Sequence, residues 1–177
     1  MTAWNDWYHV TGHTYGTWLP GDPRGWREKG HKRHVDGDYK TPPPAGTGEG
    51  LLAHSRRAMK QDVVQFDPAR RAIAGRAIVA FLLGKGFEII ALSLDAIHFH
   101  LLGRFGEGEV KRPIGQAKVN AYYRLRDAGH RGKVWGRSCG VRPIAGRDHQ
   151  VRVYNYIREH ERIGAWVWTH EEGVYWE

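Results

Sequence analysis

Cysteine is scarce in this chain, and long apolar runs are missing. Cys139 is the only cysteine among 177 residues, so an internal disulfide cannot form, which excludes a disulfide-stapled fold and favours the reducing cytoplasm. No basic segment followed by an apolar run opens the sequence, so we expect no secretory leader. The longest apolar stretch is interrupted by Lys85 and Glu88 and falls short of the roughly 20 residues that span a bilayer. We therefore expect a cytoplasmic protein with no membrane partner.

Acidic residues are outnumbered, with 19 Asp and Glu against 27 Lys and Arg, a formal charge of +8 and a pI near 9.8. This balance favours a polyanionic partner such as nucleic acid, although a merely soluble basic surface has the same composition. With 41% hydrophobic residues, 177 residues make one domain with a real core and are too few for two. We therefore predict a single domain over 1–177.

One segment, at about 20–50, departs from the rest of the chain in composition. It is rich in proline and glycine, contains three consecutive prolines at 42–44 and carries a basic run at 29–34. Such a stretch has too little apolar surface to order itself, so we predict a loop insertion. Trp18 and Trp26 indicate that parts of it dock back on the domain. Whether the insertion contacts DNA or is only a loop stays open.

Hydrophobic periodicity predicts the regular elements. Alternating aromatic and β-branched residues predict a strand at 7–14, and helical spacing after Asp67-Pro68 predicts a helix at 70–83. Asp148 is expected to cap the last helix. The remaining predictions are strands at 87–94, 97–105 and 133–144, helices at 110–127 and 148–162, and an aromatic strand or clasp from 165 onward. This order predicts an α+β fold, an antiparallel sheet with helices packed on it, of the ferredoxin-like or palm type.

The most informative motif is His98-Phe99-His100, inside a run that otherwise has the character of a buried strand. Side chains two residues apart on a strand point to the same face, so both imidazoles project together while Phe99 packs behind them. Two imidazoles on one rigid element supply half of a divalent-metal site. The alternative is a pair of ordinary structural histidines.

A second motif lies in the last predicted helix, where Tyr156 and His160 are four residues apart and share one face. A tyrosine one turn from a metal ligand suits attack on a phosphodiester, because the metal polarises the phosphate and the phenolate forms a covalent phosphotyrosine. The alternative is an ordinary core or interface tyrosine. Tyr154 lies roughly 200° around the helix, so it cannot be the nucleophile in the same geometry.

These motifs resemble those of the single-tyrosine transposases of the HUH endonuclease superfamily, and within it the REP-associated tyrosine transposases. The run at 97–102 resembles the histidine-hydrophobic-histidine strand of that family, and Tyr156-Ile-Arg-Glu-His160 is similar to its C-terminal tyrosine helix. The stretches at 8–11 and 15–26 also look like an N-terminal signature of such relatives. The resemblance covers most of the chain outside 27–65.

The resemblance implies a single-domain HUH fold in which His98 and His100 bind a catalytic Mg²⁺ or Mn²⁺ and His160 stands where many relatives carry glutamine. It implies that Tyr156 nicks and rejoins single-stranded or hairpin DNA with repeated palindromic ends through a covalent 5′-phosphotyrosine. It also implies a monomer or homodimer that is nucleoid-associated when bound to DNA. Imidazole ligands by themselves prefer Zn²⁺ or Mn²⁺ to Mg²⁺. Two alternatives remain, a catalytically inactive regulator that binds structured nucleic acid and a metal phosphodiesterase that uses water.

Basic side chains are the candidate DNA contacts, because neutralising phosphates gives a salt-dependent affinity that is mostly independent of sequence. Exposed tryptophans such as Trp26, Trp135 or Trp166 could stack on unpaired bases, and the sequence does not choose among them. The predicted nucleic-acid-binding residues are Lys111, Arg112, Lys118, Arg124, Arg126, Arg137 and Arg142.

Overall fold

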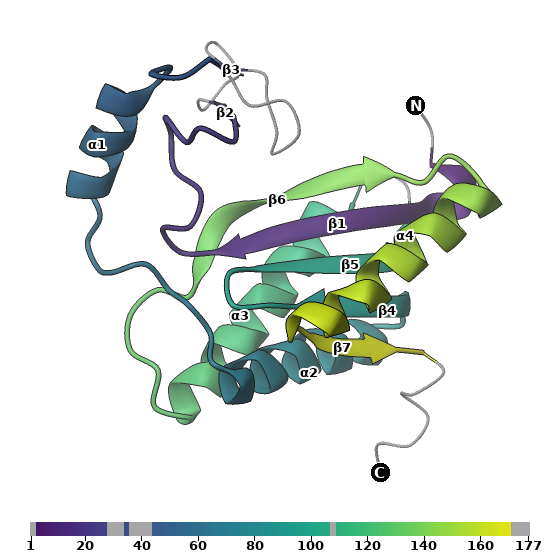
Figure 1. Cartoon of the computed structure of the whole chain (residues 1–177). Coiled ribbons are helices and arrows are strands. Elements are labelled where there is room, and N and C mark those ends of the chain that lie inside the picture. The colour runs from purple at the N-terminus through teal and green to yellow at the C-terminus, as the bar shows by residue number, and fades with distance from the viewer. Residues whose placement is uncertain (1–2, 28–33, 36–43, 107–108, 171–177) are drawn as a thin grey trace.

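A five-stranded sheet forms the centre of the computed structural model, which describes residues 3–27, 34–35, 44–106 and 109–170. Its strand order is β6-β1-β5-β4-β7, and every neighbouring pair is antiparallel (Figure 1). The predicted α+β class with an antiparallel sheet is therefore confirmed. The strands are β1 (Trp7–Thr14), β4 (Glu88–Leu94), β5 (His98–Arg104), β6 (Trp135–Pro143) and β7 (Trp166–Thr169).

Helices cover the two faces of this sheet unequally (Figure 1). Two of them, α2 (Pro68–Gly84) and α3 (Lys111–Asp127), lie on one face, which we call the back face. The other, front face carries α4 (Arg147–Glu159), which continues as the short 3-10 helix η2 (His160–Ile163). A further 3-10 turn, η1 (Trp4–Asp6), precedes β1.

A local capping signal explains where α2 begins, whereas the one expected for α4 is wrong. Asp67 caps α2, since its carboxylate accepts a hydrogen bond from the backbone N–H of Arg70 at 2.8 Å, and Pro68 occupies the first helical position. The expected Asp148 cap is wrong, because Gly146 is the N-cap of α4 and makes no side-chain capping bond. Asp148 lies in the first turn instead, where its charge suits the helix dipole.

The side chains of β5 alternate between the two faces. Phe99 and Leu101 have no exposed surface and pack on the back face against α2 and α3. Leu102 points forward into a smaller cluster beneath α4, together with Ile157. Because the strand has a period of two, His98 and His100 must also point forward.

Two stretches of the predicted insertion at about 20–50, residues 28–33 and 36–43, lie outside the described residues. They include the basic run up to residue 33 and the prolines at 42–43. The described parts of the insertion include a short antiparallel pair, β2 (Trp26–Arg27) with β3 (His34–Val35). A helix that was not predicted, α1 (Glu49–Arg57), follows them. The aromatic tail forms β7, and its last residues, 171–177, are also outside the described part. No helix among the described residues is long and apolar enough to cross a membrane.

Candidate metal centre

The three histidines predicted as ligands meet on the front face. His98 and His100 project from β5 with ring centroids 4.8 Å apart, and His160 reaches them from the start of η2, with its ring 4.8 Å from that of His100. One ligand nitrogen from each ring lies within 4.8 Å of the other two. The cluster can therefore hold one metal ion.

Asp95 fixes the orientation of His98. Its carboxylate accepts a hydrogen bond from Nδ1 of His98 at 2.7 Å and two more from the backbone N–H groups of Ile97 and His98, each at 2.7 Å. Burial raises the pKa of Asp95, but these hydrogen bonds outweigh it and the net shift is downward. With Nδ1 committed to Asp95, His98 presents Nε2 to the cluster.

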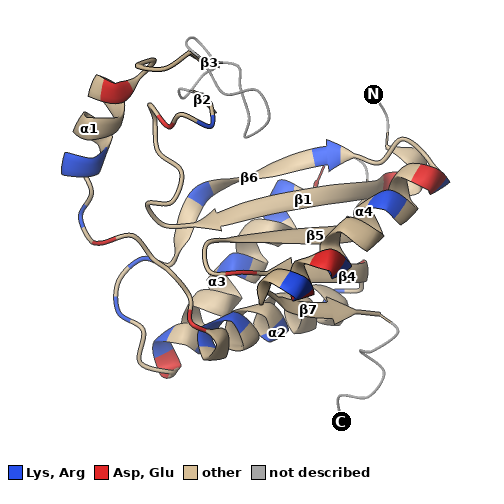
Figure 2. Ribbon diagram, viewed as in Figure 1, with Lys and Arg blue, Asp and Glu red and all other residues tan. Residues whose placement is uncertain are grey.

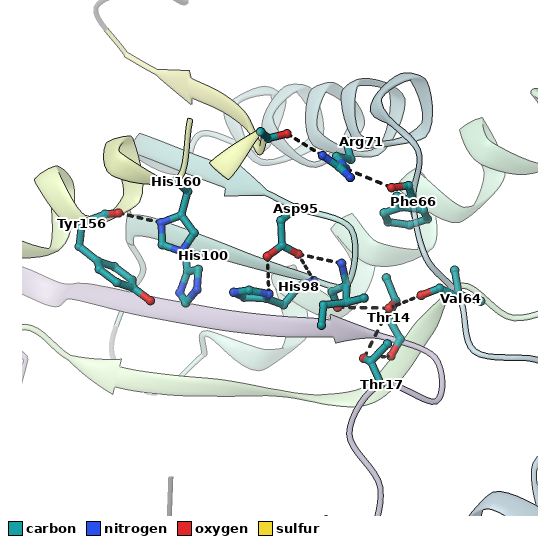
Figure 3. Close-up of polar contacts among 12 residues, drawn as sticks. Thr14, Thr17, Val64, Phe66, Arg71, Asp95, His98, His100, Tyr156 and His160 are labelled. Carbon is teal, nitrogen blue, oxygen red and sulfur yellow. Dashed lines mark hydrogen bonds and ion pairs between the residues drawn. The ribbon is translucent and has the colours of Figure 1, made fainter. Parts of the chain in front are cut away.

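His160 is held in the same manner by the backbone. Its Nδ1 donates to the carbonyl oxygen of Tyr156, one helical turn earlier, at 2.7 Å, and the side chain is buried. This bond leaves Nε2 of His160 as the available ligand atom. Figure 3 shows this contact together with the Asp95–His98 pair.

His9 orients the ring of His100 through its Nδ1. Nε2 of His9 lies 3.0 Å from Nδ1 of His100, while Nε2 of His100 is buried and has no hydrogen-bond partner among the described residues. Burial, followed by the charges of neighbouring histidines, holds the pKa of His100 far below its ordinary value, so the ring is neutral and can bind a metal. Ser93 is the strand partner of His100, and its buried hydroxyl likewise has no hydrogen-bond partner within the ranges that the structure describes.

This donor set fits a divalent transition metal. It consists of three imidazole nitrogens, each ring being oriented through its second nitrogen by a carboxylate, a carbonyl or another imidazole, as is usual for metal-bound histidine. The orphaned Nε2 of His100 is the observation that most directly supports a ligand, because an unpaired buried polar atom costs roughly 1–3 kcal/mol. Of the two predicted ions, Mn²⁺ suits imidazole better than Mg²⁺.

Tyr156 lies beside this cluster. Its ring centroid is 4.6 Å from His160, 5.1 Å from His100 and 6.2 Å from His9, and the side chain is 42% exposed. Tyr154, by contrast, packs against the apolar cluster beneath α4. The predicted separation of the two tyrosines therefore holds.

Most of the predicted DNA-binding residues lie away from the histidines. Figure 2 shows Lys and Arg spread over α2, α3, α4 and β6. The exposed residues of α3 are on the back face, since its buried side chains, such as Leu125, belong to the cluster around Phe99. The exposed basic residues of α3 that the sequence singled out are Lys111, Arg112, Arg124 and Arg126.

Lys118 and the two arginines of β6 differ from that group. Lys118 is only 7% exposed, and its ammonium donates to the carbonyl oxygens of Gly136 and Ser138 at 2.7 and 3.2 Å. Burial also lowers its pKa, so Lys118 joins α3 to β6 and its ammonium is turned inward, away from any DNA at the surface. Arg137 and Arg142 are exposed, and Arg142 is the strand partner of His9 on the front face.

Two residues of the site, His9 and Asp95, were missed in the sequence. Strand periodicity predicts that His9 shares one face of β1 with Thr11 and His13. Its contact with His100, however, depends on the pairing of β1 with β5. Asp95 carried a better signal, because an Asp at a tight connection commonly bonds the backbone two or three residues later.

No protein-family model and no curated protein matches the sequence. Among solved structures, a chain described as "Structure of the REP associates tyrosine transposase bound to a REP hairpin" is similar over 93% of this chain and 71% of its own length. The sequences are 11% identical and the TM-score is 0.47. This likeness is distant, so no residue role is transferred from it.

Proposed function

We propose that this protein is a metal-dependent enzyme that nicks and rejoins single-stranded DNA through a covalent bond to Tyr156. One observation carries the proposal: a tyrosine ring stands 4.6 and 5.1 Å from two of three histidines that can share a metal ion. A tyrosine with only a structural role would not need to be partly exposed beside the unpaired Nε2 of His100.

The residues supply a complete transfer step. The phenolic oxygen of Tyr156 attacks the phosphorus, the bond from phosphorus to the 3′ oxygen breaks, and the phenolic proton leaves to solvent while the 3′ oxygen gains one. The 5′ phosphate stays on Tyr156, and attack by a 3′ hydroxyl reverses the step, so rejoining needs no external energy. A divalent ion, when bound by the three histidines, polarises the phosphate and lowers the pKa of a phenol that is near 10 in water.

Arg142 is our candidate for a phosphate contact near the site. It is exposed on β6. Its positive charge also acts on His9, since the pKa of His9 is lowered to about 4 by burial first and by Arg142 second. We propose that Arg137, also exposed on β6, makes a further phosphate contact. The basic residues of α3 then make a separate contact, because they lie across the sheet from the nucleophile.

Detection of a covalent adduct tests the proposal. The protein is incubated with Mn²⁺ and single-stranded hairpin oligonucleotides taken from the flanks of its own gene, and a denaturing gel separates adducts from free DNA. We expect an adduct with the wild type and with Tyr154→Phe, the matched control from the same helix. Tyr156→Phe is expected to lose the adduct entirely while its DNA affinity changes little.

Two other results would contradict the proposal and identify its alternatives. Binding that survives chelation and gives no adduct with any metal would indicate a non-catalytic DNA-binding protein. Cleavage by Tyr156→Phe without an adduct would indicate a phosphodiesterase in which water attacks.

A further inference from the structure

Trp18 is an exposed aromatic residue close to the histidine cluster, and neither the core nor the proposed chemistry uses it. It lies four residues after the end of β1 and leaves 44% of its surface accessible to solvent. Tryptophan is costly to expose because it presents a large apolar surface to water. An exposed position next to a reactive site is therefore a reason to look for a ligand.

The Trp18 ring is held rigidly despite this exposure. Its Nε1 donates to the carbonyl oxygen of Gly25 at 2.7 Å, and the guanidinium of Arg24 lies over the ring, 4.6 Å from its centroid. Arg24 is itself fixed by two hydrogen bonds to the carboxylate of Asp22, at 2.8 and 2.6 Å, and donates to the Thr17 carbonyl. A ring fixed in advance loses little conformational entropy when a ligand stacks on it.

His13 connects Trp18 to the metal centre. The rings of His13 and Trp18 are 6.2 Å apart, and His13 is the strand partner of His98, on the same face of the sheet. His13 also fills the space above Gly136, where any side chain would overlap its ring. His13 therefore links the strand position beside His98 to the ring of Trp18.

Tyr156 and Trp18 lie on different sides of the metal centre. Tyr156 contacts His160 and His100, whereas Trp18 is reached from His98 through His13. A DNA strand whose phosphate is held at the histidines and attacked from the Tyr156 side can therefore place a neighbouring base at Trp18.

We propose that Trp18 is a stacking subsite for one unpaired nucleobase of the strand bound at the histidine cluster, with Arg24 covering the remaining face of the indole. The inference rests on the proposed function, because it takes the ligand to be single-stranded DNA. A nucleobase fits better than an apolar protein partner, since the ring is flanked by a guanidinium, which also attracts the DNA backbone. Stacking on an aromatic ring is tolerant of sequence, so this subsite would strengthen binding without selecting a base.

A comparison of two probes isolates the base. The probes are a fluorescently labelled 20-nucleotide oligothymidine and an abasic strand of equal length, and their dissociation constants are measured by anisotropy in Mn²⁺. Trp18→Ala is expected to weaken binding of oligothymidine by roughly 5- to 150-fold, the usual worth of one stacked base. Binding of the abasic strand should stay unchanged. Trp18→Phe should keep most of the affinity, because the phenyl ring still stacks.

Tyr123→Ala is the matched control. Tyr123 is 48% exposed and has Arg126 over its ring at 5.0 Å, but it stands on α3 at the back face. Tyr123→Ala should leave the ratio of the affinities for oligothymidine and the abasic strand as in the wild type. An equal fall with Tyr123→Ala would overturn the subsite, because the stacking would then not be local to the histidines.

Three further outcomes would also overturn the subsite. The first is a Trp18→Ala variant that binds oligothymidine normally, which would leave Trp18 to a protein partner. The second is an equal loss for both probes, and the third is an equal loss with Trp18→Phe and Trp18→Ala, which would assign the effect to the hydrogen bond with Gly25. Base-dependent loss at Trp18 in a protein that forms no Tyr156 adduct would instead support the subsite and contradict only the proposed chemistry.

Discussion

The two faces of strand β5 carry opposite kinds of side chain, although they belong to the same seven residues. On the back face Phe99 and Leu101 are fully buried beneath α2 and α3. On the front face His98 and His100 stand beside the end of α4, where the helix passes into η2 and supplies His160. Two helices close a face with apolar packing, whereas one helix leaves room for polar groups at its end.

The polar groups of the front face lower the stability of the fold. The buried Nε2 of His100 and hydroxyl of Ser93 find no hydrogen-bond partner in the described part of the chain, and each unpaired group costs roughly 1–3 kcal/mol. The back face offsets such costs through its continuous apolar cluster. The comparison therefore predicts that substitutions behind β5 change stability, while those in front change ligand binding.

The largest expected effect is that of Phe99→Ala. The ring is fully buried and lies against Gly12, where an added Cβ would overlap it. Removing it leaves a cavity and should lower the free energy of unfolding by about 3–5 kcal/mol, measured by urea denaturation of the metal-free protein.

His98→Ala is the paired control one residue earlier. Its imidazole is 35% exposed, so we expect a change in unfolding free energy of under about 1 kcal/mol together with loss of metal binding. Comparable destabilisation by the two substitutions would contradict the division of roles between the faces.

The sequence was sufficient for the elements that carry strong local signals. The predicted strands at 87–94 and 97–105 agree with β4 and β5 to within one residue at each end. Asp67 and Pro68 located the start of α2 to within two residues. The pairing of His98 with His100 followed from strand periodicity alone, and the spacing of Tyr156 and His160 followed from the helix.

The features that could not be predicted from the sequence depend on pairing and packing between distant segments. The contact between His9 and His100 requires the register of β1 against β5. The sequence predicts Lys118 as a surface residue, but it lies four positions after Ile114, on the buried stripe of α3. Helix α1 follows a left-handed glycine, Gly48, and buries none of its residues, so no core-facing stripe marks it in the sequence.

A smaller effect is expected from Asp95→Asn, which tests the front face without replacing any of the three histidines. The amide oxygen can still accept from the backbone N–H groups, but the NH₂ group then faces Nδ1 of His98 and favours the tautomer whose Nε2 carries a proton. Metal affinity should fall by about 10- to 100-fold, measured by titration calorimetry with Mn²⁺.

Asp67→Asn provides the control for that substitution. Asp67 caps α2 by accepting from the Arg70 N–H, and asparagine caps helices as well as aspartate does. Its metal affinity should equal that of the wild type. An unchanged affinity with Asp95→Asn would show that the carboxylate does not set the tautomer of His98.

The smallest expected effect is a dependence of stability on pH that comes from the front face. Burial, then the charges of Lys118, Arg24 and His98, lowers the pKa of His13 from 6.5 to about 4. The unfolded chain therefore takes up a proton before the folded protein does, so stability falls as the pH drops below about 6.5 and levels off below about 4. For His13 alone the loss between pH 8 and pH 6 should be roughly 1 kcal/mol. Urea denaturation of metal-free wild type and His13→Gln at both pH values measures this difference, and equal losses in the two proteins would mean that His13 does not contribute to it.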